Sequence, residues 1–424
     1  MKTHSNSGQK LPRRAVITGL GVISPIGIGK IAFWQSLEQG KSGITNITRF
    51  DCTGFPSQVA GEVNDFSPQE FMGAIGERRM DRFTQFGVAA AKMALKDSGL
   101  PVDQIDRTRL GVVMGTALGG MPYAEYQCAI YQVEGLKRLD PLLATKLFDG
   151  ELSSQISIEF GIKGPSYTLS NACAAATDAI GYATALIRGG VIDGCITGGA
   201  EAALTPITFG AFCRVGALTT RTGNPKQASC PFDKDRDGFV MSEGAGIIIL
   251  EELESALSRK AHIYAEVAGY AAVSEAYHMT RATEEADGFI RAMKLALADA
   301  QLDPQEIDYV NAHGTSTPLN DKTETLAIKQ VFGNRAYSLP ISSIKSMIGH
   351  PIGAAGGIEV VASALVIENQ YIPPTINYQT KDPECDLFYV PNNGMSAQVR
   401  TILKNSAGFG SVNASVILRQ YNTG

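Results

Sequence analysis

The sequence predicts an α/β protein whose sheet is largely buried. Runs rich in Val, Ile and Gly alternate with longer segments in which apolar residues recur at helical spacing. Strand-like runs such as the one at 245–253 (AGIIILEEL) contain continuous apolar stretches, which are typical of strands covered on both faces. Of 424 residues, 44% are hydrophobic, 19% are charged and 45 are Gly. This composition excludes disorder and indicates much buried backbone and many tight turns.

The first half of the chain begins with a β-rich run at 15–23, which Ser24 and Pro25 end. Apolar residues then recur at helical spacing over 31–39 and over 77–98. The other elements expected in this half are strands at 109–117, 166–170, 193–201 and 245–253, a helix at 174–188, a largely helical and irregular segment at 121–165, and a polar loop at 221–244.

The second half repeats the pattern of strand, loop and helix. Strand character resumes at 264–273, and a helix is expected at 286–300. Two strands then run into loops, at 307–314 and 341–350, each followed by a helix, at 321–333 and 353–370 respectively, and the tail 406–421 closes with one strand. The spacing alone is too weak to prove an internal duplication.

Charge and cysteine content exclude several classes of protein. With 37 Lys and Arg against 42 Asp and Glu, the net charge of −5 argues against a nucleic-acid-binding protein. Seven scattered Cys without a C-x-x-C motif predict neither a disulfide framework nor a zinc site, and they fit a reducing compartment such as the cytoplasm. No apolar run approaches 18 residues, so no membrane span is expected. Residues 1–13 are basic but lack the apolar core of a signal peptide, and we expect a disordered leader there.

Two runs resemble known ligand-binding loops, but each lacks a residue that the loop requires. The run GLGVISPIG at 19–27 has Ser24 where a dinucleotide-binding loop needs its third Gly. The run DKDRDGFVMSEG at 233–244 has acidic residues at the first three ligand positions of a calcium loop but Gly244 where the bidentate Glu belongs. We therefore expect a turn at the first run and a salt-bridged structural loop at the second.

One group of residues points to chemistry. Cys173 lies between a predicted strand and a predicted helix, and a helix N-terminus stabilises a thiolate. His313 and His350 lie in Gly- and Ser-rich loops after buried strands, where α/β proteins place their sites. A single buried Cys is most often structural, and a single loop His most often only forms hydrogen bonds. Together they allow nucleophilic catalysis, either by a Cys-protease arrangement with Asn311 or with two imidazoles stabilising an oxyanion or enolate.

Motifs throughout residues 13–420 resemble the β-ketoacyl-acyl-carrier-protein synthases of the type II class, which are condensing enzymes of the thiolase-like superfamily. The motifs that carry the resemblance are NACAAATDAIG, PFDKDRDGFVMSEGAG, VNAHGTSTPLND, SSIKSMIGHPIGAAGG, PPTIN, DPECDLFYVPN and GFGSVNAS. The resemblance implies a duplicated five-layer αβαβα sandwich with two thiolase-like halves, at 14–260 and 261–424. It also implies that the 233–244 loop is a family motif.

The resemblance implies a chemical role for four of these residues. Cys173 would carry the acyl chain as a thioester, and decarboxylation of malonyl-carrier protein would supply the attacking carbanion. His313 and His350 would stabilise the enolate. The amides of Cys173 and Phe409 would form the oxyanion hole, and the Phe409 ring would gate the pocket.

Supporting roles follow from the same resemblance. Lys345 would act electrostatically on the two His residues, and Glu324 would pair with Lys345. Thr315 and Thr317 would bind the phosphopantetheine arm of the acyl carrier protein, and the acyl pocket would start near Leu118. The resemblance implies no metal and no further cofactor, and it implies a homodimer or a heterodimer with a chain-length-factor paralogue.

Several positions leave the pathway open. Asn171 and the run AAAT at 174–177 depart from the usual fatty-acid enzymes, which have Thr and Gly there. The phrase AYHMT at 276–280 is similar to catalytic ketosynthase subunits of type II polyketide systems, whereas HGTSTP is similar to fatty-acid elongation enzymes. We expect the catalytic subunit of a polyketide or specialised acyl-chain pathway, with a housekeeping fatty-acid synthase as the alternative. A non-condensing partner subunit is disfavoured, since Cys173, His313, His350 and Lys345 are all present.

Overall fold

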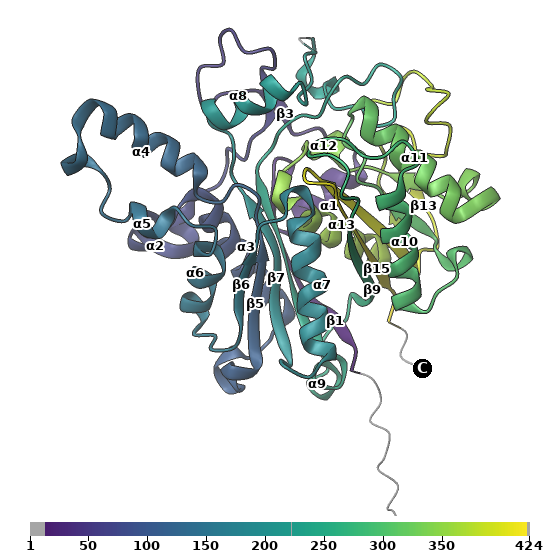
Figure 1. Ribbon diagram of the computed structural model, residues 1–424. Helices are drawn as coiled ribbons and strands as arrows, with labels where there is room; N and C mark the ends of the chain where they lie inside the picture. Colours follow the sequence, from purple (N-terminus) through teal and green to yellow (C-terminus); the bar gives the residue numbers. More distant parts are fainter. Residues whose placement is uncertain (1–12, 222, 422–424) are drawn as a thin grey trace, which may run out of the picture.

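Two sets of five strands with the same order form the centre of the molecule in the computed structural model, which describes residues 13–221 and 223–421 (Figure 1). The first set runs β6-β5-β7-β8-β1 and the second β11-β10-β14-β15-β9. In each set the first three strands are parallel to one another and the last two pairings are antiparallel. The strands are β1 (Ala15–Ser24), β5 (Leu110–Gly115), β6 (Ser166–Leu169), β7 (Gly194–Glu201), β8 (Gly244–Glu252), β9 (Ala265–Ser274), β10 (Tyr309–Asn311), β11 (Ile341–Ser342), β14 (Thr401–Gly408) and β15 (Val412–Arg419).

A short pairing between β1 and β9 joins the two sets into one hydrogen-bonded series. It consists of Val16 opposite Glu266 and Ile17 opposite Ala265. Small strands complete the architecture: β2 (Gly27–Ile28) folds back on β1, β3 (Ile44–Asn46) pairs with β4 (Val59–Gly61), and β12 (Tyr371–Ile372) pairs with β13 (Met395–Ser396). The repeated strand order supports the duplicated, thiolase-like α/β fold that the sequence predicts.

Helices occupy three layers around these strands. Helix α7 (Ala175–Arg188) and helix α13 (Ala355–Asn369) lie in the middle, where each contacts strands of both sets. Helix α3 (Arg82–Ser98) covers the outer face of the first set, and α10 (Asp287–Ala300) with α11 (Pro318–Phe332) covers the second. The other helices are α1 (Lys30–Glu38), α2 (Pro68–Arg79), α4 (Met121–Glu134), α5 (Leu143–Lys146), α6 (Glu151–Phe160), α8 (Pro206–Val215), α9 (Leu253–Ser258) and α12 (Lys345–Ile348).

Small residues let these layers approach closely. A Cβ atom placed on Gly21 of β1 would lie 1.9 Å from the carbonyl oxygen of Ala90 in α3. A Cβ on Gly246 of β8 would lie 2.1 Å from the backbone nitrogen of Ile358 in α13. These glycines explain why the predicted strands are so rich in Gly: they are in contact with helix backbone.

The middle helix α13 is apolar enough to be mistaken for a membrane span. Residues 352–369 have a mean hydropathy of 1.4 over 18 residues, and 89% of this stretch is buried inside the protein. The apolar character of α13 is therefore explained by its burial between the two sets of strands.

The structure corrects three predictions about secondary structure. The helix expected at 77–98 is two helices, because Met80 is extended between α2 and α3. The single strand expected in the tail is a hairpin of β14 and β15. Helix α8 was not predicted.

The division expected near residue 260 falls between α9 and β9 and stays a prediction.

The expected disordered leader lies almost wholly outside the described residues, which begin at Arg13. The side chain of Arg13 donates to Asp193 at 2.6 Å and to the carbonyl oxygen of Ile187 at 2.9 Å. This residue is therefore part of the folded structure and not of a leader.

Replacing Gly21 with Ala should destabilise the protein by about 1–3 kcal/mol or more, because the new methyl group overlaps a helix carbonyl that cannot move freely. Thermal unfolding followed by circular dichroism would show a lower Tm. Gly223→Ala is the matched control, since no atom lies within 4 Å of its Cβ position. Equal Tm values for the two variants would show that the layers are not in tight contact at Gly21.

Candidate active site

Cys173 lies in a single 3-10 turn, Ala172–Ala174, that joins the end of β6 to the first turn of α7. Ala172 has a φ of 46°, a left-handed conformation that is rare for a residue with a side chain and often marks a functional site. One strand ends against this turn and another against the first residues of α7. A Cβ on Gly408 would lie 3.1 Å from the Cys173 nitrogen, and a Cβ on Gly115 would lie 2.4 Å from the Ala176 nitrogen.

The thiol of Cys173 is protonated in the free protein. Burial, followed by the nearby carboxylates of Glu201 and Glu359, raises the pKa of Cys173 to about 12, and the charge of Lys345 opposes that rise. A helix N-terminus stabilises an anion by up to about 2 kcal/mol, or about 1.5 pH units of pKa, which does not offset a rise from 9.0 to about 12. The stabilisation of the thiolate by the helix N-terminus is therefore outweighed by burial in the free protein.

His313 follows β10 in a loop that is held at its backbone from two sides. Its N–H donates to a carboxylate oxygen of Glu324 at 2.8 Å, and its carbonyl oxygen accepts from Nζ of Lys345 at 2.7 Å. The next amide, that of Gly314, donates to the second oxygen of Glu324, also at 2.8 Å. The two charged residues thus fix the position of the imidazole through the main chain.

His350 follows α12 and is fixed by the loop before β8. Its N–H donates to the Val240 carbonyl at 2.7 Å, and its carbonyl accepts from the Ser242 amide at 3.0 Å. The imidazole meets the ring of Phe239 edge-on, with centroids 5.1 Å apart. The imidazoles of His313 and His350 are nearly perpendicular, with ring centroids 5.4 Å apart.

Both imidazoles are neutral at physiological pH. Burial is the largest cause, since the two residues are 3% and 2% exposed, and it places the pKa of His313 and of His350 well below 6.5. The ammonium groups of Lys345 and Lys404 act in the same direction. The Nδ1 atoms of both rings are buried without a hydrogen-bond partner among residues 13–221 and 223–421. A neutral imidazole keeps one N–H, so each ring can donate one hydrogen bond to a substrate oxygen.

The predicted pairing of Glu324 with Lys345 is wrong. The carboxylate of Glu324 accepts from two backbone amides and, at 3.1 Å, from the side-chain amide of Asn405. Lys345 instead forms an ion pair with Glu359, the one acidic residue within the buried part of α13. Glu359 was missed because a lone acid in an apolar helix carries no motif, although its burial demands a cationic partner.

Thr315 and Thr317 lie in the loop between His313 and α11, with their hydroxyl oxygens 2.9 Å apart. Asp321, in the first turn of α11, shapes this loop by accepting from the amides of Thr315 and Ser316. Arg236, from the run that resembles a calcium loop, lies 3.7 Å from Asp321. That run therefore stabilises the loop after His313 through the interaction of Arg236 with Asp321. The sequence did not reveal this role of Asp321.

Phe409 lies on the turn of the β14–β15 hairpin. Its ring stacks on Phe212 with centroids 6.0 Å apart, and Phe212 in turn meets Phe239. The turn is tied to the preceding 275–283 segment, since the Gly410 amide donates to the Met279 carbonyl at 2.8 Å. An aromatic chain thus runs from Phe409 to the ring that contacts His350.

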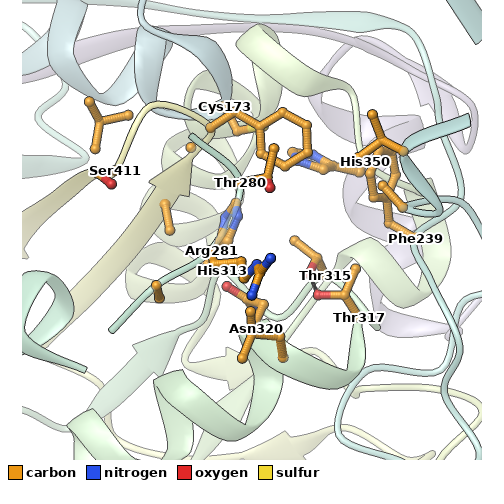
Figure 2. A pocket seen from close by; sticks show the side chains of 18 of the residues that line it. Cys173, Phe239, Thr280, Arg281, His313, Thr315, Thr317, Asn320, His350 and Ser411 are labelled. Carbon is orange, nitrogen blue, oxygen red and sulfur yellow. Dashed lines mark hydrogen bonds between the residues drawn. The ribbon is translucent and has the colours of Figure 1, made fainter. Parts of the chain in front are cut away.

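A cavity of about 410 Å³ brings these side chains together (Figure 2). The predicted site residues that line it are Cys173, His313, Thr315, Thr317, His350 and Phe409. In Figure 2 the two imidazoles and the thiol border the same open space, and the two threonines lie on its lower side with Asn320. Apolar side chains such as Phe212, Phe239 and Phe289 line the cavity together with these groups, and Asp237, Glu275 and Arg281 lie at its wall. A mixture of apolar and a few polar groups is typical of ligand sites.

Three predicted residues do not line this cavity. Lys345 and Glu324 are buried behind His313, as described above. Leu118 packs instead on an apolar cluster that also contacts Cys173 and Phe212. Its amide and that of Ala117 donate to Glu201, at 3.3 and 2.7 Å, so this buried carboxylate fixes the backbone next to the thiol.

Among the described residues, no group of three or more His, Cys, Asp and Glu side chains is arranged to hold a metal ion. The cavity therefore offers a thiol and two neutral hydrogen-bond donors. Such a set can form a thioester and stabilise negative charge on an oxygen.

Comparisons with known proteins agree with this chemistry. The model of the beta-ketoacyl synthase N-terminal domain matches residues 13–256, and that of the C-terminal domain matches residues 264–379. A 3-oxoacyl-[acyl-carrier-protein] synthase 2 of Synechocystis is 45% identical over 409 residues, which cover 96% of this chain and 98% of that protein. A Streptomyces halstedii protein designated a polyketide beta-ketoacyl synthase is 42% identical over 416 residues, which cover 96% and 98% of the two chains.

Solved structures show the same similarity. The ishigamide ketosynthase/chain length factor superposes with a TM-score of 0.92 at 40% identity, covering 97% of this chain and all of the other. A beta-ketoacyl synthase from Burkholderia phymatum superposes with a TM-score of 0.90 at 32% identity, with the same coverage. A type II polyketide ketosynthase, solved with its acyl-carrier protein, superposes with a TM-score of 0.89 at 40% identity and again with that coverage.

The chain belongs to the beta-ketoacyl synthase family, whose two domain models together match most of its length. Its activity is that of a 3-oxoacyl-acyl-carrier-protein synthase, an acyltransferase that condenses acyl units.

Alkylation of Cys173 by iodoacetamide should accelerate about tenfold per pH unit from pH 7 to pH 9, because a thiol with a pKa of about 12 remains mostly protonated over this range. Mass spectrometry of the Cys173 peptide would follow this residue separately from the other six Cys. A rate that levels off below pH 9 would show that the helix N-terminus outweighs burial.

Proposed function

We propose that Cys173 is the nucleophile of a decarboxylative condensation. Its sulfur attacks the thioester of an acyl-carrier protein, the C–S bond to phosphopantetheine breaks, and the thiol proton goes to the departing sulfur. Malonyl-carrier protein then loses CO₂, and the resulting enolate attacks the acyl-Cys carbonyl. The C–S bond to Cys173 breaks, the departing sulfur takes a proton from solvent to restore the thiol, and the product is two carbons longer. The observation that carries this proposal is the shared cavity of one thiol and two neutral imidazoles.

His313 and His350 would stabilise the enolate oxygen. A neutral imidazole can donate to that oxygen, whereas the charge it would gain by protonation is disfavoured by burial and by two nearby lysines. Lys345 would support the position of the His313 imidazole by donating a hydrogen bond to the His313 carbonyl oxygen. Glu324 would support it by holding the amides of His313 and Gly314.

The amides of Cys173 and Phe409 would form the oxyanion hole for acyl transfer. The close approach of Gly408 to the Cys173 amide supports this placement, because it brings the turn after β14 next to the nucleophile. Phe409 would gate the cavity, since its ring lies on a hairpin turn and rests on Phe212 without a covalent or ionic tie.

The substrates would arrive on an acyl carrier protein, and we infer that Thr315 and Thr317 hold the phosphopantetheine arm. Their paired hydroxyls line the cavity on the side away from Cys173 and offer donors to the amides of that arm. The acyl chain would extend into the apolar cluster around Leu118, which contacts Cys173. No metal or bound cofactor takes part in this scheme.

We further propose that the protein is the catalytic ketosynthase subunit of a type II polyketide or specialised acyl-chain pathway. The similarity to two type II ketosynthase structures supports this pathway. The higher identity to the Synechocystis synthase supports the alternative, a housekeeping fatty-acid elongating enzyme. Both pathways share the condensation chemistry and differ in substrate and partner.

Seven free Cys suit a reducing cytoplasm.

Assembly would take place along the free edge of β6, as a homodimer or as a heterodimer with a chain-length-factor paralogue. Strand β6 ends the series of strands, and Tyr167 on it is 46% exposed. Helices α4 and α6 on the same flank expose Val133 (86%) and Ile158 (74%). An unpaired strand edge flanked by exposed apolar side chains is typical of a protein interface.

Intact-protein mass spectrometry would decide between the pathways. The protein is mixed with malonyl-carrier protein and a series of acyl-carrier proteins, with and without Cys-deficient paralogues from the same genome. A saturated acyl adduct elongated once by the protein alone would identify a fatty-acid enzyme. Successive unreduced additions that require the paralogue would identify a polyketide ketosynthase.

Cys173→Ala should abolish the acyl-enzyme, because the other six Cys do not line the cavity. Intact mass after incubation with acyl-carrier protein measures this directly. Cys195→Ala is the matched control, since Cys195 is buried in β7 away from the cavity. Acylation that persists at another residue of the Cys173→Ala variant would contradict the assignment of the nucleophile.

His350→Ala should lower decarboxylation of malonyl-carrier protein by a factor of about 10²–10³ while acyl transfer to Cys173 changes far less, since loss of one oxyanion donor costs that much. Released CO₂ and the mass of the acyl-enzyme measure the two steps separately. Equal loss in both steps would refute the role of His350 in enolate stabilisation.

A further inference from the structure

A second buried lysine lies next to the site and is not among the predicted site residues. Lys404 is on β14, is 0% exposed, and interrupts an otherwise uncharged strand, TILKNSAG. A buried ammonium group is costly unless it is paired, so its presence here requires an explanation.

The ammonium group of Lys404 has three partners. Its Nζ donates to the hydroxyl of Thr177 at 2.9 Å and to the hydroxyl of Ser406. It also lies 2.9 Å from a carboxylate oxygen of Glu359, as an ion pair without the alignment of a hydrogen bond. Burial lowers the pKa of Lys404, and the carboxylate of Glu359 opposes that shift. An ammonium has three N–H groups and a neutral amine has two, so three close oxygens, one of them a carboxylate oxygen, favour the charged form.

These contacts link β14, which carries Lys404, to α7 and to α13, which carries Glu359. Thr177 is on α7, one turn after Cys173, and Ser406 is on β14, three residues before Phe409. The hydroxyls of Thr177 and Ser406 are themselves 2.8 Å apart. Lys404 therefore ties the helix of the nucleophile to the strand that leads into the gate.

Glu359 is shared between two cations. Lys345 contacts one carboxylate oxygen and Lys404 the other, and the two lysines are 1% and 0% exposed. The two lysines with Glu359 give a net charge of +1, and Lys345 of this group contacts the carbonyl oxygen of His313 at 2.7 Å. Removing Lys404 would leave Lys345 and Glu359 as a neutral pair.

We propose that Lys404 is a positioning residue for the two histidines of the cavity: its charge, held on Glu359, adds to burial and to Lys345 in disfavouring protonation of both imidazoles. The direction of the electrostatic influence supports this role, since Lys404 lowers the pKa of His313 and of His350. The other charged groups nearby are Glu324 on α11 and Asp178 on α7, both of which interact with Lys404, and Asp237, Glu275 and Arg281 at the cavity wall.

The consequence of this inference for catalysis rests on the proposed function. The titration of the two histidines can be measured without substrate and does not depend on that function. A neutral imidazole can donate its one N–H to the enolate oxygen, whereas a protonated imidazole would add a buried positive charge next to Lys345. Without Lys404 the imidazoles should protonate at higher pH. The acidic limb of the decarboxylation profile would then move to higher pH.

Histidine NMR tests the charge state without substrate. The sequence has only five His, so ¹³C–¹H spectra of His-labelled protein resolve each ring, with His313 and His350 assigned from His→Gln variants. In Lys404→Gln, which keeps a donor for Thr177 and Ser406 but no charge, the titration midpoint of at least one of them should rise by about 0.5 pH unit or more. Exposed His278 serves as an internal reference.

Two further variants separate charge from packing. Lys404→Met gives a second protein without the charge in case Lys404→Gln fails to fold, and Lys92→Met removes a lysine on the outer helix α3 that should leave all titrations unchanged. Titration midpoints of His313 and His350 that are the same in the wild type and in every Lys404 variant, with each titration carried to acidic pH, would overturn the inference even if the Tm is lowered. Absence of decarboxylation in the wild type would instead refute the proposed function.

Discussion

The structure depends on burying helix α13 on nearly all sides, and most of helix α7, between the two sets of strands. Thirteen consecutive residues of α13, from Ala355 to Ile367, are buried. Helix α7 packs against it so closely that a Cβ on Gly356 would lie 2.2 Å from the hydroxyl oxygen of Thr177. The ends of the strands and the start of α7 therefore meet in one place, and the cavity forms there.

Complete burial of residues 355–367 of α13 requires that the charge of Glu359 be matched inside the protein, and this requirement shapes the site. Glu359 cannot reach water from α13, so its charge must be matched by cations within the core. Lys345 and Lys404 provide them from two different elements. The same cations lie close to His313 and His350, and together with burial they keep both imidazoles neutral. A requirement of folding and a requirement of the proposed chemistry are thus met by the same three residues.

The two halves use the same local geometry for different purposes. Both middle helices follow a 3-10 turn that begins with a left-handed residue, Ala172 with φ 46° and Ile352 with φ 40°. The second position of the turn is Cys173 in one half and Gly353 in the other. A Cβ on Gly353 would lie 2.4 Å from the Ala117 nitrogen, so no side chain fits there. The second half therefore makes room for the loop beside the nucleophile, and its histidines come from the neighbouring loops.

The sequence by itself determined the class of fold, the order of most strands and helices, and the candidate residues Cys173, His313 and His350, because periodicity and local motifs are short-range properties. It failed where the answer depends on distant segments. It paired Lys345 with Glu324 and overlooked Glu359 and Lys404, since the partner of a buried charge is chosen by packing between α12, α13 and β14. It also indicated that a helix N-terminus stabilises the thiolate of Cys173, but it could not show the burial that raises the pKa of this thiol. Only the tertiary structure sets how much water each group loses, and that loss decides the protonation state on which the proposed chemistry depends.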